Sequence, residues 1–216
     1  MRNRSRPHVR CETCYMRRDL CFCRLIEPIH SATKVLLVVH RGEAQKPTNT
    51  ARLIKLLMPQ SDIRYYGLAH EKLDIAADIP SGTTPLVLFP EPSAPILDSR
   101  YIAQINQPIT LIVPDGTWKQ ARKIAHRLQS LSGIPRVRLA PGSSSRYQLR
   151  RNQAPQGLCT IEAVSLALEA IEGPSIREQL DRYLSVLIER VQWARRTSQE
   201  FGGTKPYCVG PASGLP

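Results

Sequence analysis

One short segment of the chain, Pro114 to Trp118, holds residues whose types and order could bind a ligand. It follows an apolar run directly and leads into a helical pattern. Gly116 would let backbone amides face a ligand, and a helix N-terminus favours an anionic group such as an amino-acid carboxylate. The same residues also fit a structural role, because Asp115 or Thr117 is a good helix cap and Trp118 is a typical core residue. The segment alone leaves both interpretations open.

Two further segments carry polar residues at the start of a helical pattern. Thr48, Asn49 and Thr50 stand in a row, and three good N-cap residues exceed what capping needs. Residues 157–163 lead into another helix. Here Cys159 is better explained as a small buried residue than as a nucleophile, because no His can be argued to lie beside it.

A loop rich in hydroxyl groups and arginines lies at residues 143–151. Its Arg146, Arg150 and Arg151 alternate with other polar residues and with Tyr147. Arginine binds phosphate through two parallel hydrogen bonds, and a tyrosine ring can stack on a base. The pattern therefore predicts a loop that contacts RNA.

Four of the six cysteines, Cys11, Cys14, Cys21 and Cys23, lie within thirteen residues. Two close pairs joined by a short loop can place four thiolates at the corners of a tetrahedron, which is the geometry of structural zinc. Four protein ligands leave no open position, so the pattern argues against a catalytic zinc. Disulfides and unliganded thiols are the alternatives, and a reducing cytosol disfavours the disulfides.

The formal net charge of +12 is concentrated in two segments. Residues 1–24 hold seven Arg and two acidic residues, and residues 115–151 hold nine Lys or Arg and one acidic residue. Concentrated positive charge suits a polyphosphate partner, because neutralising phosphates releases condensed counterions. A generally basic protein is the plainer alternative. Outside the arginine-rich loop, the candidate RNA contacts are Arg17, Arg18, Lys119, Arg122 and Lys123.

The elements that must position these residues follow from the apolar pattern. Strand alternating with helix predicts an α/β fold with a mostly parallel sheet flanked by helices. Strands are expected at 34–40, 85–90, 108–114 and 136–139. Helices are expected at 50–58, 94–104, 117–131, 160–172 and 175–196. Ligands of open parallel sheets bind beyond the carboxyl ends of the strands, which here means the loops after Val39, Phe89, Val113 and Leu139.

A chain of 216 residues is long enough for one main domain with a small appendage. The expected division is a zinc knuckle with a basic arm at 1–30, an α/β catalytic domain at 31–200 and a flexible tail at 201–216. No stretch approaches the roughly 20 apolar residues that cross a bilayer, and the N-terminus lacks the apolar run of a secretory signal. A soluble cytoplasmic protein is expected.

In this combination and order, the motifs resemble the DTW-domain family, the tRNA-uridine aminocarboxypropyltransferases. The matching pieces are the four cysteines, Pro47 to Leu53, Phe89-Pro90, Asp115 to Lys123, Ser145 to Arg150 and Cys159 to Ala163. The resemblance implies transfer of the 3-amino-3-carboxypropyl group of S-adenosylmethionine to N3 of a tRNA uridine, with release of methylthioadenosine. It also implies a SPOUT-like fold with a knotted cofactor site, which composition and periodicity do not show.

The resemblance places a functional aspartate at Asp115. As a catalytic base, Asp115 would take the proton from uridine N3. An ordinary Asp titrates near about 3.9, so this role needs burial of the carboxyl group or a cation that acidifies the uracil, such as Arg146, Arg150 or Lys119. Otherwise Asp115 would hold N3–H or the cofactor amine in place. The residues expected to hold the cofactor are Thr48, Asn49, Thr50, Phe89, Pro90, Val113, Pro114, Gly116, Thr117, Trp118, Cys159, Thr160 and Glu162.

Two other functions stay open, a SPOUT-like RNA methyltransferase and a non-catalytic zinc-knuckle RNA-binding protein. P-loop and dinucleotide-binding enzymes are disfavoured because their glycine patterns do not occur in the sequence. A Ser-His-Asp hydrolase lacks its Gly-x-Ser-x-Gly elbow. A monomer is favoured.

Overall fold

The computed structural model of the chain describes residues 10–68, 72–142, 145–147, 149 and 157–200, without the side chains of 197–200. The predicted tail at 201–216 and the predicted RNA contacts Arg150 and Arg151 lie outside the described residues, as do residues 1–9 of the predicted basic arm.

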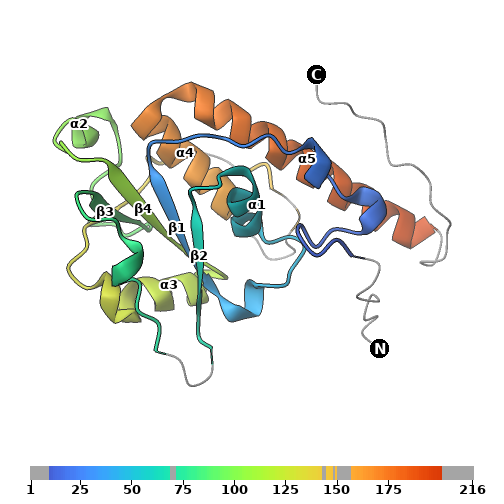
Figure 1. Cartoon of the computed structure of the whole chain (residues 1–216), viewed down its shortest axis with the longest axis horizontal. Coiled ribbons are helices and arrows are strands. Elements are labelled where there is room, and N and C mark those ends of the chain that lie inside the picture. The colour runs from blue at the N-terminus through green and yellow to red at the C-terminus, as the bar shows by residue number, and fades with distance from the viewer. Residues whose placement is uncertain (1–9, 69–71, 143–144, 148, 150–156, 201–216) are drawn as a thin grey trace.

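Five parallel strands form one sheet in the order β2-β1-β4-β3-β5 (Figure 1). The strands are β1 (Lys34–His40), β2 (Asp62–Tyr66), β3 (Thr84–Leu88), β4 (Ile109–Asp115) and β5 (Arg136–Val137). The central strands β1 and β4 are buried along nearly their whole length, because helices cover both faces of the sheet. The predicted α/β class with a mostly parallel sheet is confirmed. The knotted cofactor site stays a prediction.

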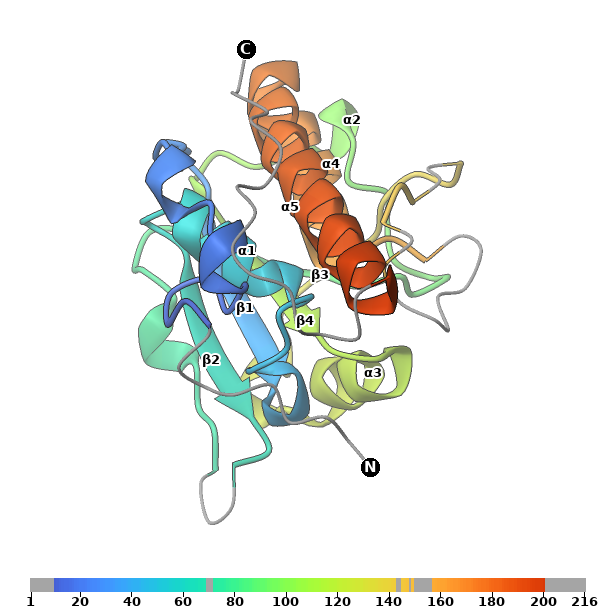
Figure 2. The ribbon, with the colours of Figure 1, turned by 90° about the vertical axis from the view of Figure 1, so that its right-hand side faces the viewer.

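Alternate residues of β1 point into two separate cores on the two faces of the sheet. Val35, Leu37 and Val39 pack with α1, α4, α5 and the N-terminal segment. Leu36 and Val38 pack with α3 on the opposite face. The two C-terminal helices α4 and α5 lie side by side (Figure 2). The helices are α1 (Thr50–Leu57), α2 (Ser99–Ile102), α3 (Trp118–Arg127), α4 (Thr160–Glu172) and α5 (Pro174–Glu200).

The structure adds one strand that the sequence pattern did not predict. β2 is the edge strand, pairs in parallel with β1, and is partly exposed along its whole length. Its polar residues Asp62 and Arg64 interrupt the apolar run that marks a buried strand. Two predicted helices are also shorter than expected, because α2 spans only four residues and α3 gives way to a 3-10 turn at Gln129–Leu131.

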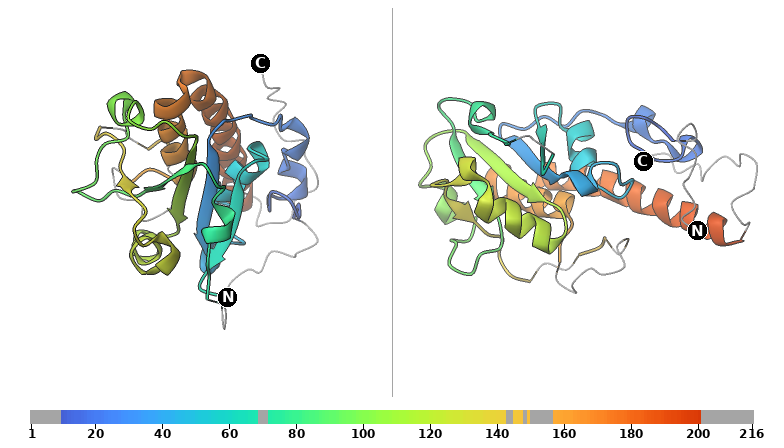
Figure 3. Two further views of the ribbon diagram at one scale, coloured as in Figure 1. Left: turned by 60° about the vertical axis from the view of Figure 1, so that its left-hand side comes forward. Right: turned by 90° about the horizontal axis from the view of Figure 1, so that it is seen from below.

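The N-terminal segment packs along the outer part of α5 (Figure 3, right). Leu20 and Phe22 are buried in the core that α5 shares. Tyr183 of α5 donates a hydrogen bond to the carbonyl of Leu25 at 3.1 Å and accepts one from the amide of Glu27 at 2.8 Å. The cysteine-bearing segment therefore completes the apolar core of the α/β unit.

Among the helices of the described ranges, each is too short or too polar to span a bilayer.

Candidate functional site

A cavity of about 790 Å³ lies at the carboxyl ends of β3 and β4. Its wall continues through residues that follow β1 and β5 and through the starts of α3 and α4. The strand-end position agrees with where open parallel sheets bind ligands. The cavity is therefore the candidate ligand site.

Asp115 is the last residue of β4, lines this cavity and is only 2% exposed. One carboxylate oxygen accepts a hydrogen bond from Asn49 Nδ2 at 2.9 Å, and the other accepts one from the hydroxyl of Thr160. Asn49 is the N-cap of α1, and Thr160 is the first residue of α4. The carboxylate thus ties the end of a central strand to the starts of two helices.

The turn after Asp115 is held by a network around Gln120. Gln120 and Thr117 form a capping box, in which Gln120 Oε1 accepts from the Thr117 amide at 2.8 Å. Gln120 Nε2 lies 3.0 Å from His40 Nδ1, which also accepts from the Gly42 amide at 3.1 Å. A Cβ on Gly116 would lie 2.8 Å from Gln120 Cβ, so this close approach requires glycine. The Thr117 amide is engaged by the cap, and a ligand carboxylate would have to compete for it.

Glu162 organises the loop that closes one side of the cavity. Its carboxylate accepts hydrogen bonds from the Ser145 hydroxyl at 2.7 Å, the Arg146 amide at 2.7 Å and the Cys159 amide at 2.8 Å. Glu162 is buried and does not line the cavity. The prediction of a direct cofactor contact is therefore corrected, because both carboxylate oxygens hold backbone or side-chain groups of the protein.

Tyr147 lies inside the protein, where it is fully buried and lines the cavity. Its hydroxyl donates a hydrogen bond to the carbonyl of Thr48 at 2.5 Å. The predicted stacking of Tyr147 on an RNA base is wrong for this arrangement, because the ring has no surface open to solvent. The position assigns Tyr147 to the wall of the ligand site.

Most of the residues predicted to hold the cofactor come together around the cavity. They are Thr48, Phe89, Pro90, Val113, Pro114, Gly116, Thr117, Trp118, Cys159 and Thr160. Asn49 and Thr50 do not line it. Asn49 binds Asp115, and the Thr50 hydroxyl accepts from the Ile161 amide at 3.3 Å, so both residues act on the helix starts that frame the site.

Two charged residues of the cavity wall, Glu43 and Arg138, were not among the candidates from the sequence, whereas Lys46 begins the candidate segment at 46–53. Glu43 and Lys46 follow β1 and form an ion pair at 2.5 Å. Arg138 follows β5 and donates from Nε to the Ala94 carbonyl at 2.9 Å. The available signal was their position just beyond the carboxyl ends of strands, since their residue types alone carry no distinguishing spacing.

Cys159 is buried in the wall of the cavity at the N-cap of α4. Burial raises the pKa of its thiol well above the ordinary value, and the neighbouring Glu162 carboxylate adds to the shift. A thiol that stays protonated is a poor nucleophile. The geometry supports the prediction that Cys159 is structural.

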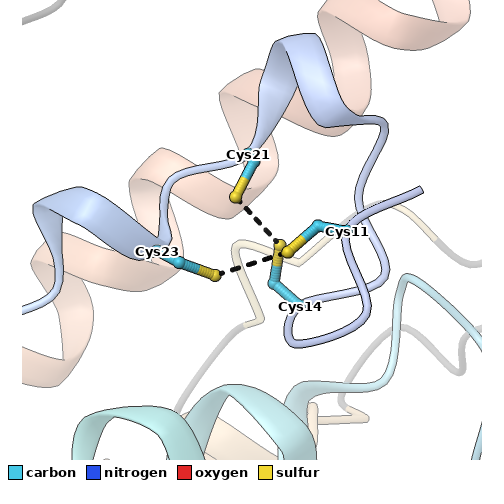
Figure 4. A group of neighbouring side chains, drawn as sticks. All are labelled: Cys11, Cys14, Cys21 and Cys23. Carbon is cyan, nitrogen blue, oxygen red and sulfur yellow. Dashed lines mark hydrogen bonds between the residues drawn. The ribbon is translucent and has the colours of Figure 1, made fainter. Parts of the chain in front are cut away.

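The sulfur atoms of Cys11, Cys14, Cys21 and Cys23 all lie within 4.8 Å of one another (Figure 4). Two of the separations, Cys11 to Cys23 and Cys14 to Cys21, are 3.8 Å. A zinc–sulfur distance of about 2.3 Å gives tetrahedral edges of about 3.8 Å, so the four thiols fit a tetrahedral zinc ion. The same separations are far longer than a disulfide bond, and all four cysteines are free.

Some of the described residues predicted to contact RNA already form ion pairs within the protein, and others do not. Arg17 pairs with Asp19 at 2.5 Å, and its guanidinium lies 5.7 Å from the ring centroid of Trp193. Arg146 pairs with Asp181 at 3.0 Å. The remaining described candidates are exposed, namely Arg18, Lys119, Arg122 and Lys123.

The fold and the site together define a class of protein, an α/β protein with a ligand cavity at the strand ends of a parallel sheet and a four-cysteine cluster packed on its core. Comparison with known families makes the class specific. The DTW domain matches residues 8–192, and the chain belongs to the DTW-domain family. The resemblance drawn from the motifs is thereby confirmed.

Several relatives carry names that describe their activity. A tRNA-uridine aminocarboxypropyltransferase 2 of Macaca fascicularis is 26% identical over 183 residues, which cover 82% of this chain and 61% of that protein. The Drosophila melanogaster protein of the same name is 28% identical, over 82% of this chain and 73% of the relative. The tRNA-uridine aminocarboxypropyltransferase A of Arabidopsis thaliana is 27% identical, over 85% of this chain and 80% of the relative.

The fold resembles that of a solved structure. It is the SAM-dependent rRNA:acp-transferase Tsr3 from Vulcanisaeta distributa, with a TM-score of 0.50 and 19% sequence identity. The match covers 79% of this chain and 83% of that one. At this identity the likeness concerns the fold alone.

Proposed function

We propose that the chain transfers the 3-amino-3-carboxypropyl group of S-adenosylmethionine to N3 of a uridine in tRNA. Membership of the DTW-domain family and the names of its relatives support this reaction. The single observation that carries it is the cavity at the strand ends, whose wall includes Asp115, Gly116, Thr117 and Trp118 of the family's motif. A cavity of about 790 Å³ falls in the size range of cofactor sites.

The proposed reaction is a displacement at the sulfonium centre. Uridine N3 forms a bond to the carbon of the three-carbon arm that adjoins sulfur, the bond from that carbon to sulfur breaks, and its electron pair stays on sulfur. N3 gives up its proton to solvent water, and methylthioadenosine leaves. Three carbons adjoin the sulfonium, so the orientation imposed by the cavity decides which group is transferred.

Within this proposal Asp115 positions other groups. Its two oxygens accept from Asn49 and Thr160, which fixes the starts of α1 and α4 around the cavity. A carboxylate already engaged in this way is better suited to hold the wall in place than to abstract the N3 proton. The cations of the wall, Lys46 and Arg138, are candidates for the carboxylate of the aminocarboxypropyl arm.

The four-cysteine cluster is proposed to hold one structural zinc ion. Thiolates at four tetrahedral corners leave the metal no open position, so the ion would stabilise the N-terminal segment and take no part in the transfer. The division into a zinc knuckle at 1–30 and a catalytic unit at 31–200 is part of the same proposal.

The test is incubation of bulk tRNA with the purified protein and S-adenosylmethionine, followed by mass spectrometry of the nucleosides. The expected products are aminocarboxypropyluridine and methylthioadenosine. A methylated nucleoside with S-adenosylhomocysteine would identify an RNA methyltransferase instead. Binding of tRNA without any modified nucleoside would point to a non-catalytic RNA-binding protein.

A further inference from the structure

Trp118 is the most exposed large hydrophobic residue of the described chain, at 51%. It begins α3, three residues after Asp115, and lines the cavity. The alternative of a core residue is wrong, because a core residue would be buried. An indole ring that is half exposed at the edge of a ligand cavity offers a face to something that arrives from solvent.

The exposed side of α3 that continues from Trp118 is basic throughout. Residues four apart lie on one side of a helix, so the exposed side chains of α3 form two adjacent rows along it. His126, at the end of one row, lies with its ring 5.7 Å from that of Phe89, which lines the cavity. This contact places the basic side next to the cavity. The two rows are Trp118, Arg122, His126 and Lys119, Lys123, Arg127.

In the described structure no acidic group pairs with the Lys and Arg side chains of α3, whereas several cations elsewhere are paired. Arg17, Arg146 and Arg177 each form an ion pair. In the described structure Lys119, Arg122, Lys123 and Arg127 form none, and α3 itself contains no acidic residue. Unpaired cations on one helix face are available to phosphates.

We propose that Trp118 is the platform on which the target nucleobase stacks, while the cations of α3 bind the phosphates that flank it. This inference rests on the proposed function and assigns Trp118 to the RNA instead of the cofactor. An unpaired base has both faces open to an aromatic ring, and uridine N3 is reachable only when the base is unpaired. A base stacked at this edge would face the cavity that holds the transferable group.

The surface fits single-stranded RNA better than an acidic protein. Stacking on one exposed indole suits a flat base, and a row of cations one helical turn apart suits a regularly charged backbone. Arg17 of the N-terminal segment is a weaker candidate for a phosphate contact than the α3 cations, because it is engaged with Asp19 and Trp193.

The stacking is tested through the fluorescence of Trp118 in a Trp193→Phe background, which leaves one tryptophan and keeps an aromatic ring beneath Arg17. S-Adenosylhomocysteine is added first, and bulk tRNA second. We expect little change with the first and strong quenching with the second. Quenching by S-adenosylhomocysteine alone, with no further change on adding tRNA, would overturn the proposal in favour of a cofactor contact.

A kinetic comparison provides the second readout. Base–aromatic stacking is worth about 1–3 kcal/mol, so Trp118→Leu is expected to raise KM for tRNA roughly 10-fold while the Kd for S-adenosylmethionine stays within about 2-fold. Trp118→Phe should recover most of the loss. A KM that does not change in Trp118→Leu would contradict the stacking role.

The phosphate contacts are tested with a matched pair of double variants. Arg122→Glu with Lys123→Glu should weaken tRNA binding and lower the salt slope by about 1 for each lost contact. Arg100→Glu with Arg182→Glu changes the net charge equally at exposed sites on α2 and α5 and should have little effect. Equal losses in the two pairs would show a general charge effect and overturn the assignment to α3.

These outcomes are separable from those of the proposed function. If no modified nucleoside forms but tRNA still quenches Trp118, the transferase proposal fails and the stacking site stands. If the modified nucleoside forms but only S-adenosylhomocysteine quenches Trp118, the transferase proposal stands and the stacking proposal fails.

Discussion

At the scale of single residues, Asp115 joins three elements through one carboxylate. Its partners Asn49 and Thr160 are 66 and 45 positions away in the chain. The sequence predicted that Asp115, Asn49 and Thr160 belong to one site, because each follows a strand or begins a helix. It could not predict that the amide and the hydroxyl bind the carboxylate, since such pairing depends on how the helix starts meet.

Asp115→Asn tests whether this carboxylate positions the wall or acts as a base. The amide oxygen can still accept from Asn49, but the amide nitrogen must then donate to the Thr160 hydroxyl, and both hydrogen bonds lose the charge of the carboxylate. Charge-assisted hydrogen bonds are roughly twice as strong as neutral ones, so we expect the unfolding free energy and the affinity for S-adenosylmethionine to fall together. Calorimetric titration and urea unfolding measure both.

A matched variant is Thr160→Val, which removes one donor to the same carboxylate and keeps the side-chain shape. Thr160→Val should also lower both the unfolding free energy and the affinity for S-adenosylmethionine. If Asp115→Asn keeps normal cofactor affinity and stability while kcat collapses, the base role is correct and the positioning role is not.

At the scale of elements, the strands β1, β3 and β4 were predictable because continuous apolar runs mark strands covered on both faces. The edge strand β2 was not, because polar residues alternate with apolar ones along it and every residue is partly exposed. Its place in the sheet is set by pairing with β1, which is a tertiary contact. The same limit applies to the loop at 145–147, whose inward Tyr147 reads as a surface residue in the sequence.

The attachment of this loop to α4 gives a prediction for Glu162→Gln. Three hydrogen bonds reach the Glu162 carboxylate, and a glutamine has only one acceptor oxygen to receive them. We expect a loss of about 1–3 kcal/mol in unfolding free energy and weaker binding of S-adenosylmethionine, because Tyr147 on the loop lines the cavity. Urea unfolding and titration calorimetry measure the two effects.

Glu169→Gln is the control on the same helix, where it removes a partly exposed ion pair with Arg177. Pairs of that kind contribute about 0–1 kcal/mol. Equal destabilisation by the two substitutions would argue against a specific stabilising role of the hydrogen bonds to Glu162.

At the scale of the whole molecule, the cysteine segment and α5 are packed as one body with the sheet. Arg52 of α1 also reaches this segment, since its guanidinium lies 3.7 Å from the ring centroid of Tyr15. The cysteine spacing predicted the cluster, which the structure brings together. Nothing in the spacing predicted that residues beside the cysteines fill the core under α5, because that contact joins opposite ends of the chain.

Because the segment is part of the core, removing the proposed zinc should destabilise the entire protein. Cys14→Ser is expected to abolish binding of about one zinc per chain and to lower the Tm. Metal content by mass spectrometry and Tm by calorimetry check the two results. Cys159→Ser, which lies away from the cluster, should leave the metal content unchanged. Full stability of the Cys14 variant without metal would refute the structural role.

The contact between Tyr183 and Leu25 joins residues 158 positions apart. A ribosome releases the cysteine segment before α5, so this segment stays without its contacts to α5 until that helix has emerged. Such distant contacts slow the search for the native state. The cysteines are therefore expected to be most vulnerable to oxidation during synthesis, before α5 packs against the segment that carries them.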